Sequence, residues 1–149
     1  MVKVVHTITI QSSASRLFAE LMDFEHSYRW QTEEVLKEWH TPEGPVTIGT
    51  KGYQKRMFRG KPTETMNVVT VFEQDQRMVA ESPSSRVEYQ IQALSENEAR
   101  LDFSIELFLK GVAVLFSPLI QRGLQKDVVA RFQNLKRYLE TGRELRTSW

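Results

Sequence analysis

The strongest structural signal in the sequence is a pair of stretches with strictly alternating apolar and polar residues, Val87-Glu-Tyr-Gln-Ile-Gln-Ala93 and Leu101-Asp-Phe-Ser-Ile-Glu-Leu107. A period of two places the apolar side chains of each stretch on one face of a strand. One buried and one wetted face is typical of an antiparallel sheet. The polar residues Ser95 to Glu98 between the stretches predict a tight turn. The sequence therefore predicts a hairpin with one side packed on a core.

Working outward, five further strands are expected. The first starts at Val4, where Val4, His6, Ile8 and Ile10 share one face, and the others cover residues 35–39, 53–59, 63–72 and 78–82. Breaker residues separate them, among them Gly60-Lys61-Pro62 and the loop from His40 to Gly49. For residues 35–39, 53–59 and 63–72 the pattern leaves open which side chains face inward.

Helices are expected after the first strand, where there are two short ones, and at the C-terminus, where there is one long one. Ser12 and Ser13 offer N-cap oxygens to a short helix, and a second short helix or turn follows from Asp23 to Trp30. A long helix is expected over Pro118–Glu140, with Ser117 as its N-cap and Gly142 as its stop. Its apolar residues recur every three or four positions, which predicts one buried stripe: Ile120, Leu124, Val128, Phe132, Leu135 and Leu139.

This order predicts an α+β architecture in which a curved, six- to seven-stranded antiparallel sheet wraps around the C-terminal helix, with two short helices after strand 1. The terminal helix is the one large apolar partner available to such a sheet. We expect residues 1–149 to form a single domain, because no linker or repeat interrupts the pattern. The gap between a curved sheet and a helix is a favoured place for a ligand pocket.

Composition narrows the possible functions. The 149 residues carry 20 Lys and Arg against 19 Asp and Glu, so the net charge gives no overall attraction to nucleic acid or membranes. The absence of cysteine excludes disulfides and thiolate chemistry. The longest apolar run, near Gly111–Phe116, is too short to cross a bilayer, and no signal peptide is visible. We therefore expect a cytoplasmic protein without an integral membrane segment, as a monomer or weak homodimer.

The chain resembles the START/Bet v 1-like superfamily (SRPBCC), whose fold is the helix grip, and in detail its bacterial polyketide cyclase/dehydrase-type branch. The resemblance covers about Val2 to Glu140. It rests on the opening from Ile8 to Phe24, on Trp30, on the loop Gly44-Pro-Val46 with Ile48-Gly-Thr50, on Val69–Glu73 with Arg77-Met78, and on Asn134–Glu140. These positions set turns and packing, so they indicate the fold far more than the function.

The resemblance implies a cavity for a hydrophobic or amphipathic molecule such as a lipid, quinone or polyketide. The first functional hypothesis is therefore a binding protein that needs no cofactor. An alternative is an enzyme of the cyclase or dehydratase type. A second alternative is a protein-interaction domain that docks a partner through its basic hairpin and helix. The His and Cys ligands of Rieske-type members are missing, so no iron centre is implied.

Three titratable residues are candidates for proton transfer. His6 shares the inward face of the first strand, and Tyr89 lies on the inward face of its own strand. Glu64 shares a face with Met66, Val68 and Phe72, and would lie at one end of the cavity if that face is inward. Each also has a purely structural interpretation as a packed or solvated side chain. His26 and His40 lack the spacing of metal ligands, so no metal site is predicted.

Aromatic residues supply the expected ligand contacts. We expect Tyr28, Trp30 and Phe116 to line the mouth of the cavity, and Tyr53, Tyr89 and Phe103 to lie deeper. The alternative for Trp30 is that it only fills the gap between the short helices and the sheet.

Two basic stretches remain, one at Lys51–Lys61 and one along residues 118–149. We interpret both as solvated faces, because the apolar stripe of the long helix is needed for the core. We expect no stacked, exposed aromatics among the basic residues, which argues against binding of single-stranded nucleic acid.

Overall fold

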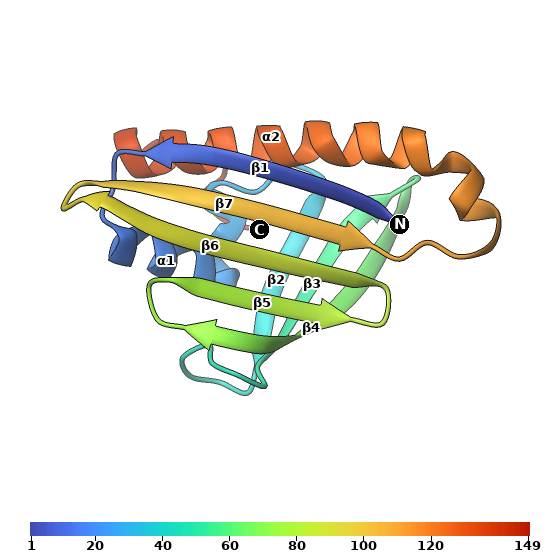
Figure 1. Ribbon diagram of the computed structural model, residues 1–149, viewed down its shortest axis with the longest axis horizontal. Coiled ribbons are helices and arrows are strands. Elements are labelled where there is room, and N and C mark those ends of the chain that lie inside the picture. The colour runs from blue at the N-terminus through green and yellow to red at the C-terminus, as the bar shows by residue number, and fades with distance from the viewer.

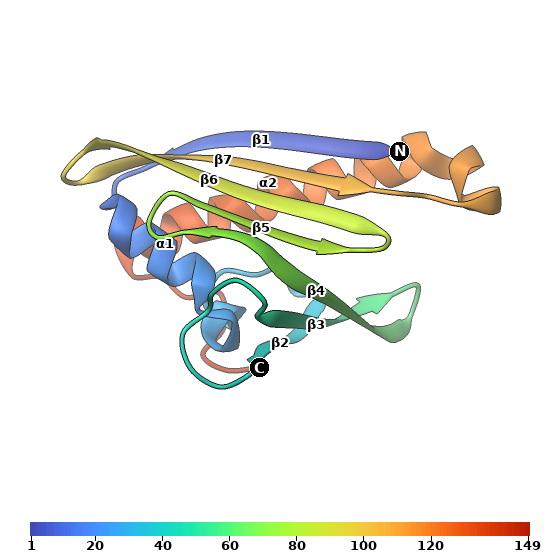
Figure 2. The same ribbon diagram turned by 60° about the horizontal axis from the view of Figure 1, so that its bottom comes forward.

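The computed structural model describes residues 1–149 and contains one seven-stranded antiparallel sheet in the order β1-β7-β6-β5-β4-β3-β2. The strands are β1 (Val2–Ile10), β2 (Val35–Thr41), β3 (Lys51–Phe58), β4 (Lys61–Glu73), β5 (Arg77–Ser82), β6 (Ser85–Ser95) and β7 (Glu98–Leu107). The sheet curls around a long C-terminal helix, as Figures 1 and 2 show. The predicted fold class is therefore confirmed.

The chain crosses from one edge of the sheet to the other only once. After β1 it passes through α1 (Ala14–Met22) and the 3-10 helix η1 (Phe24–Arg29) to β2 at the far edge. From there β2 to β7 form a meander of neighbours that returns to pair with β1 (Figure 1). Tight turns make this possible, and at the β3–β4 turn Arg59 and Gly60 both adopt the positive φ of a two-residue hairpin loop.

The helices begin and end close to where the sequence predicts. Ser13 caps α1, because its Oγ accepts a hydrogen bond from the Arg16 N–H at 3.1 Å. The long helix α2 spans Ser117–Thr141, and Gly142 ends it in the left-handed conformation. Ser117 is not the N-cap, because the 3-10 helix η2 (Gly111–Phe116) runs directly into α2 and Ser117 already has helical dihedrals.

The core lies between the concave, inner face of the sheet and the C-terminal half of α2. Phe132 of α2 is at its centre and is fully buried. Its ring lies 4.8 Å from Phe103 of β7 and 6.3 Å from both Tyr89 of β6 and Trp30, measured between centroids. Leu17, Phe18 and Leu21 of α1 join the same apolar cluster. Aromatic side chains from three parts of the chain therefore fill this half of the space.

A bulge in β4 settles the orientation that the sequence leaves open. The pairing of β4 with β5 shifts between Val69 and Val71, so residues before and after the shift change faces. Val69 and Phe72 both reach the core, whereas Glu64 and Met66 point outward and are exposed. The inward orientation considered for Glu64 is therefore wrong, because the bulge separates its face from that of Phe72.

Away from β1, burial of the inner face falls from one end of α2 to the other. Tyr89, Phe103, Val128 and Leu135 are buried, at the C-terminal half of α2. On the same face nearer the N-terminal half of α2, Val2 and Val4 of β1 stay buried. The other residues there are only partly buried or exposed: Thr63, Thr65, Val87, Ile105, Leu107, Ile120 and Leu124. The sheet thus closes on one half of the helix and leaves its own inner face partly uncovered at the other.

Candidate functional site

A charged cluster lies where the closed and uncovered halves meet. One turn of α2 places Asp127 and Arg131 on the side that faces the sheet, with Arg131 Nη2 donating to Asp127 Oδ2 at 2.6 Å. Arg56 of β3 lies 3.4 Å from the other oxygen of Asp127, which also accepts a hydrogen bond from the Thr32 hydroxyl at 3.0 Å. Arg131 is buried, although it is charged.

The electrostatics of the cluster favour its charged form. Burial alone would raise the pKa of Asp127, but the positive charges of Arg131 and Arg56 outweigh burial and hold that pKa below its usual value. Burial likewise works against the charge of Arg131, and Asp127 restores it by raising the pKa of the guanidinium. The guanidinium carbon also lies 5.9 Å from the Phe103 ring centre and 6.0 Å from that of Phe132.

Tyr89 and Glu38 extend this cluster onto the sheet. Burial raises the pKa of Tyr89 to about 12, against the opposing effect of the nearby Arg131. The phenol is therefore protonated at neutral pH and can donate a hydrogen bond. Glu38 of β2 accepts hydrogen bonds from Ser27, Gln31 and Gln54, so its carboxylate is fixed on the inner face. The donors Arg131 and Tyr89 and the acceptors Asp127 and Glu38 thus lie in the same part of the interior.

Four buried polar atoms around the cluster have no partner in the protein. They are Arg131 Nε, Trp30 Nε1, Gln31 Oε1 and His6 Nε2. Buried polar groups are almost always hydrogen-bonded, and each one left without a partner costs roughly 1–3 kcal/mol. Three of these four atoms belong to residues that are at least nine-tenths buried, namely Trp30, Gln31 and Arg131. This concentration of unused hydrogen-bonding groups marks the interior as a candidate binding site.

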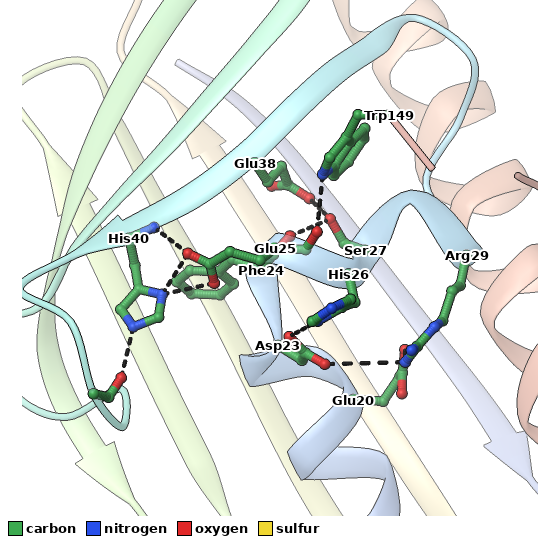
Figure 3. Close-up of polar contacts among 11 residues, drawn as sticks. Glu20, Asp23, Phe24, Glu25, His26, Ser27, Arg29, Glu38, His40 and Trp149 are labelled. Carbon is green, nitrogen blue, oxygen red and sulfur yellow. Dashed lines mark hydrogen bonds and ion pairs between the residues drawn. The ribbon is translucent and has the colours of Figure 1, made fainter. Parts of the chain in front are cut away.

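Polar contacts hold η1 against β2 beside this cluster (Figure 3). Glu25 bonds both the backbone N–H and the imidazole Nδ1 of His40, while His40 Nε2 lies 2.7 Å from the Gly44 carbonyl oxygen. The end of the chain returns to the same place, where Trp149 Nε1 donates to the Glu25 carbonyl at 2.9 Å. Since η1 leads directly to Trp30 and Gln31, these contacts position two of the unpartnered groups.

The structure brings together four of the residues singled out in the sequence. Phe103 is the cross-strand neighbour of both His6 and Tyr89. The His6 ring stacks on Phe132 at 6.1 Å, and the Trp30 ring stacks on the same side chain. His6, Trp30, Tyr89 and Phe103 therefore surround one residue of α2.

The expected positions of three other aromatics need correction. Tyr53 is not deep in the interior: it stacks on Trp39 at 5.3 Å on the outer face, because its neighbours Gly52 and Gln54 take the inward positions. Tyr28 packs edge-on against Trp149, and Phe116 is exposed at the end of η2. Trp30 is buried, and its ring contacts neither Tyr28 nor Phe116, so these three side chains do not form one mouth.

Sequence reasoning missed the charged residues of the site. The signal for Asp127 and Arg131 was present as an opposite-charge pair four residues apart, adjacent to Val128 and Phe132 of the apolar stripe. Glu38 had no such signal, because its inward orientation depends on the irregular pairing between Val35 and Lys37.

Two surface hollows are lined mainly by polar residues. One of about 370 Å³ lies on β5 and β6 beside Arg77 and Glu88, and one of about 210 Å³ lies between α2 and Arg143–Leu145. Neither is the apolar cavity expected between sheet and helix. No group of three or more His, Asp or Glu side chains is arranged to hold a metal ion. None of the helices combines the length and the hydropathy that crossing a membrane requires.

A curled antiparallel sheet that grips a C-terminal helix, with polar groups buried between them, defines a protein of the START-like, helix-grip class. The model of the family described as "Polyketide cyclase / dehydrase and lipid transport" matches residues 1–140, and the chain belongs to this family. Among curated proteins, none matches the sequence.

Solved structures with the same fold are distant in sequence. A START superfamily protein from Mycobacterium smegmatis is 15% identical with a TM-score of 0.70, and the match covers 93% of this chain and 97% of that protein. The di-domain ARO/CYC BexL from the BE-7585A biosynthetic pathway is 13% identical with a TM-score of 0.72, covering 94% of this chain and 47% of BexL. The Aha1 dimer from Colwellia psychrerythraea is 16% identical with a TM-score of 0.64, covering 95% and 98%. These similarities establish the fold.

Proposed function

We propose that the protein binds a small molecule with an apolar body and a hydrogen-bond-accepting group between α2 and the inner face of the sheet. The observation that carries this proposal is the buried Arg131 beside Tyr89, next to the partly covered apolar residues Val87, Ile105 and Leu124. Arg131 Nε and Trp30 Nε1, which have no partner in the protein, and the protonated Tyr89 hydroxyl supply donors for the polar group of the ligand. A lipid, quinone or polyketide has this combination of apolar body and oxygen acceptors.

The family membership supports this proposal at the level of ligand class. The family description names lipid transport as well as polyketide cyclisation and dehydration. Because Phe132 and its aromatic neighbours fill the closed half, the ligand would lie toward the N-terminal half of α2, with its polar group at the Asp127–Arg131 cluster.

Tyr89→Phe tests the proposal with little disturbance, because it removes one hydroxyl and no apolar packing. Anilinonaphthalene sulfonate is a suitable probe, since it joins apolar rings to an anionic acceptor and becomes fluorescent when desolvated. We expect saturable binding to the wild type and an affinity that is about 5–10-fold lower for Tyr89→Phe, the loss of roughly one hydrogen bond. Fluorescence titration measures both.

The matched control is Tyr53→Phe, which removes the same hydroxyl from the outer face. Its affinity for the probe should equal that of the wild type. If the probe does not saturate, or if Tyr53→Phe weakens binding as much as Tyr89→Phe, the proposed site is wrong.

A second candidate function is catalysis of the cyclase or dehydratase type, favoured by the positions of His6 and Tyr89. Both face inward, one strand on either side of Phe103, which separates them by about 10 Å, two strand spacings. Phe132 packs on Phe103 between them, so a substrate would have to displace the Phe132 ring to meet both groups. Glu64 does not contribute, because it lies on the outer face.

A further inference from the structure

A group of apolar side chains is exposed where η2 runs into α2. Val112 is 75% exposed, Leu115 79% and Leu119 65%, and Val114 and Phe116 are about half exposed. Val112 and Leu115 are three residues apart in a 3-10 helix, and Leu115 and Leu119 are four apart, so they share one side of the segment. We call these five residues the η2 surface. It is additional to the core stripe of α2, whose members Val128, Phe132 and Leu135 are buried.

Two segments at this end of the molecule carry only positive charges, with Glu64 and Glu106 just outside them. Residues 44–63 and 107–126 together contain eight of the 20 Lys and Arg residues and none of the 19 Asp and Glu residues. Arg56 is used in the ion pair with Asp127. The other seven form no ion pair: Lys51, Lys55, Arg59, Lys61, Lys110, Arg122 and Lys126. Although the net charge of the whole chain is close to zero, residues 44–63 and 107–126 are therefore strongly basic.

The two basic segments lie at the same end of the molecule. In both ribbon views the turn between β3 and β4 and the start of α2 are on the right, with the N-terminus of β1 (Figures 1 and 2). The β3–β4 turn repeats the combination seen at η2, because Phe58 is 57% exposed and the Arg59 guanidinium lies 5.4 Å from its ring centre. Exposed apolar side chains and unpaired cations thus occur together on two separate elements.

We propose that this end of the protein docks on the surface of an anionic lipid bilayer. Val112, Leu115, Phe116 and Leu119 enter the interface, while Lys110, Arg122 and the basic hairpin contact the headgroup phosphates. A short amphipathic segment that combines apolar and basic residues binds membranes in this way without crossing them. The charge distribution favours a membrane over a second copy of the chain, because a symmetric dimer through this face would bring unpaired cations together.

Vesicle flotation at about 0.1 M salt tests the proposal on the full chain. We expect binding to vesicles of phosphatidylcholine with a quarter phosphatidylglycerol, and weak binding to phosphatidylcholine alone. The double variant Leu115→Ser and Leu119→Ser should lower partitioning at least 10-fold, since two exposed apolar side chains lose their burial. Lys110→Gln and Arg122→Gln should each lower it about 5-fold on anionic vesicles, because one basic residue near such a surface contributes about that factor.

Leu94→Ser provides the matched control. Leu94 is 46% exposed in the β6–β7 hairpin, at the opposite end of the molecule in Figure 1, so this variant should partition like the wild type. Circular dichroism establishes that all variants are folded. Equal binding to both vesicle types, equal binding by all variants, or no binding would overturn the proposal. If light scattering shows a dimer that dissociates in the Leu115→Ser variant, and no vesicle binding is seen, the surface would be assigned to a second copy instead.

Discussion

At the scale of single residues, Trp30 has the most evident structural role. The residue is 2% exposed, its ring stacks on Phe132, and it belongs to the main apolar cluster. These contacts favour the interpretation in which Trp30 fills the gap between η1 and the sheet. Its unpartnered Nε1 would nevertheless be available to a ligand that reaches the interior.

Trp30→Ala separates a packing role from a gating role. We expect a loss of roughly 3–5 kcal/mol in the free energy of unfolding, because a large buried aromatic leaves a cavity that the surroundings cannot fill. Chemical denaturation measures this value. A loss below about 1 kcal/mol, the range of a surface substitution, together with altered on- and off-rates of the probe, would instead identify Trp30 as a gate.

The orientation of some site residues could be predicted from the sequence, and that of others could not. Strict alternation placed His6, Tyr89 and Phe103 correctly on the inner face, because β1, β6 and β7 pair there without a shift. Glu64 and Glu38 were not predictable, because each follows from an irregularity that depends on the partner strand. Arg131 was missed because a cation next to an apolar stripe is usually solvated, whereas here Asp127 compensates its charge.

At the scale of elements, the packing of α2 against the sheet depends mainly on one side chain, Phe132. Phe132 contacts aromatic residues of β6, β7 and the segment after η1. Phe132→Ala should cost roughly 3–5 kcal/mol of stability, whereas Val129→Ala, on the exposed side of the same helix, should cost well under 1 kcal/mol. Urea denaturation measures both. Similar small losses for the two variants would mean that α2 does not belong to the core.

The junction of η1 with β2 should respond to pH through His40. Burial would lower the pKa of this imidazole, but acceptors at both ring nitrogens, the Gly44 carbonyl and the Glu25 carboxylate, raise it above its ordinary value. A raised folded-state pKa means that the contribution is complete below the unfolded pKa of about 6.5 and is lost as pH rises through the folded value.

We therefore expect His40→Asn to lower the Tm more at pH 5.5 than at pH 8.5, as measured by differential scanning calorimetry. Glu25→Gln should weaken the same pH dependence, since it removes the charged partner. Glu43→Gln is the control, because Glu43 is exposed and bonds neither ring nitrogen. An equal loss for His40→Asn at the two pH values would show that the imidazolium contributes nothing to this junction.

At the scale of the whole molecule, the aromatic core fills one half, the proposed binding site begins at its border, and the η2 surface lies at the far end of the other half. The aromatic cluster around Phe132 fixes the C-terminal half of α2, while the N-terminal half of α2, η2 and the β3–β4 hairpin have few buried apolar side chains. Segments with little buried contact open locally at a small fraction of the global unfolding free energy. Local opening at this end would admit a ligand to the Asp127–Arg131 cluster without disturbing the core, and the same end carries the η2 surface.

This division predicts an uneven pattern of amide hydrogen exchange. Amides of β6 and β7 near Tyr89 and Phe103, and of α2 after Val128, should exchange slowest, because they open only on global unfolding. Amides of η2, the first turns of α2 and the β3–β4 turn should exchange fastest. Saturating anilinonaphthalene sulfonate should slow exchange around Val87, Ile105 and Leu124, while the outer-face residues of β5 stay unchanged. Uniform protection along α2, or protection by the probe confined to the outer hollow beside Arg77 and Glu88, would contradict both the division into halves and the interior site.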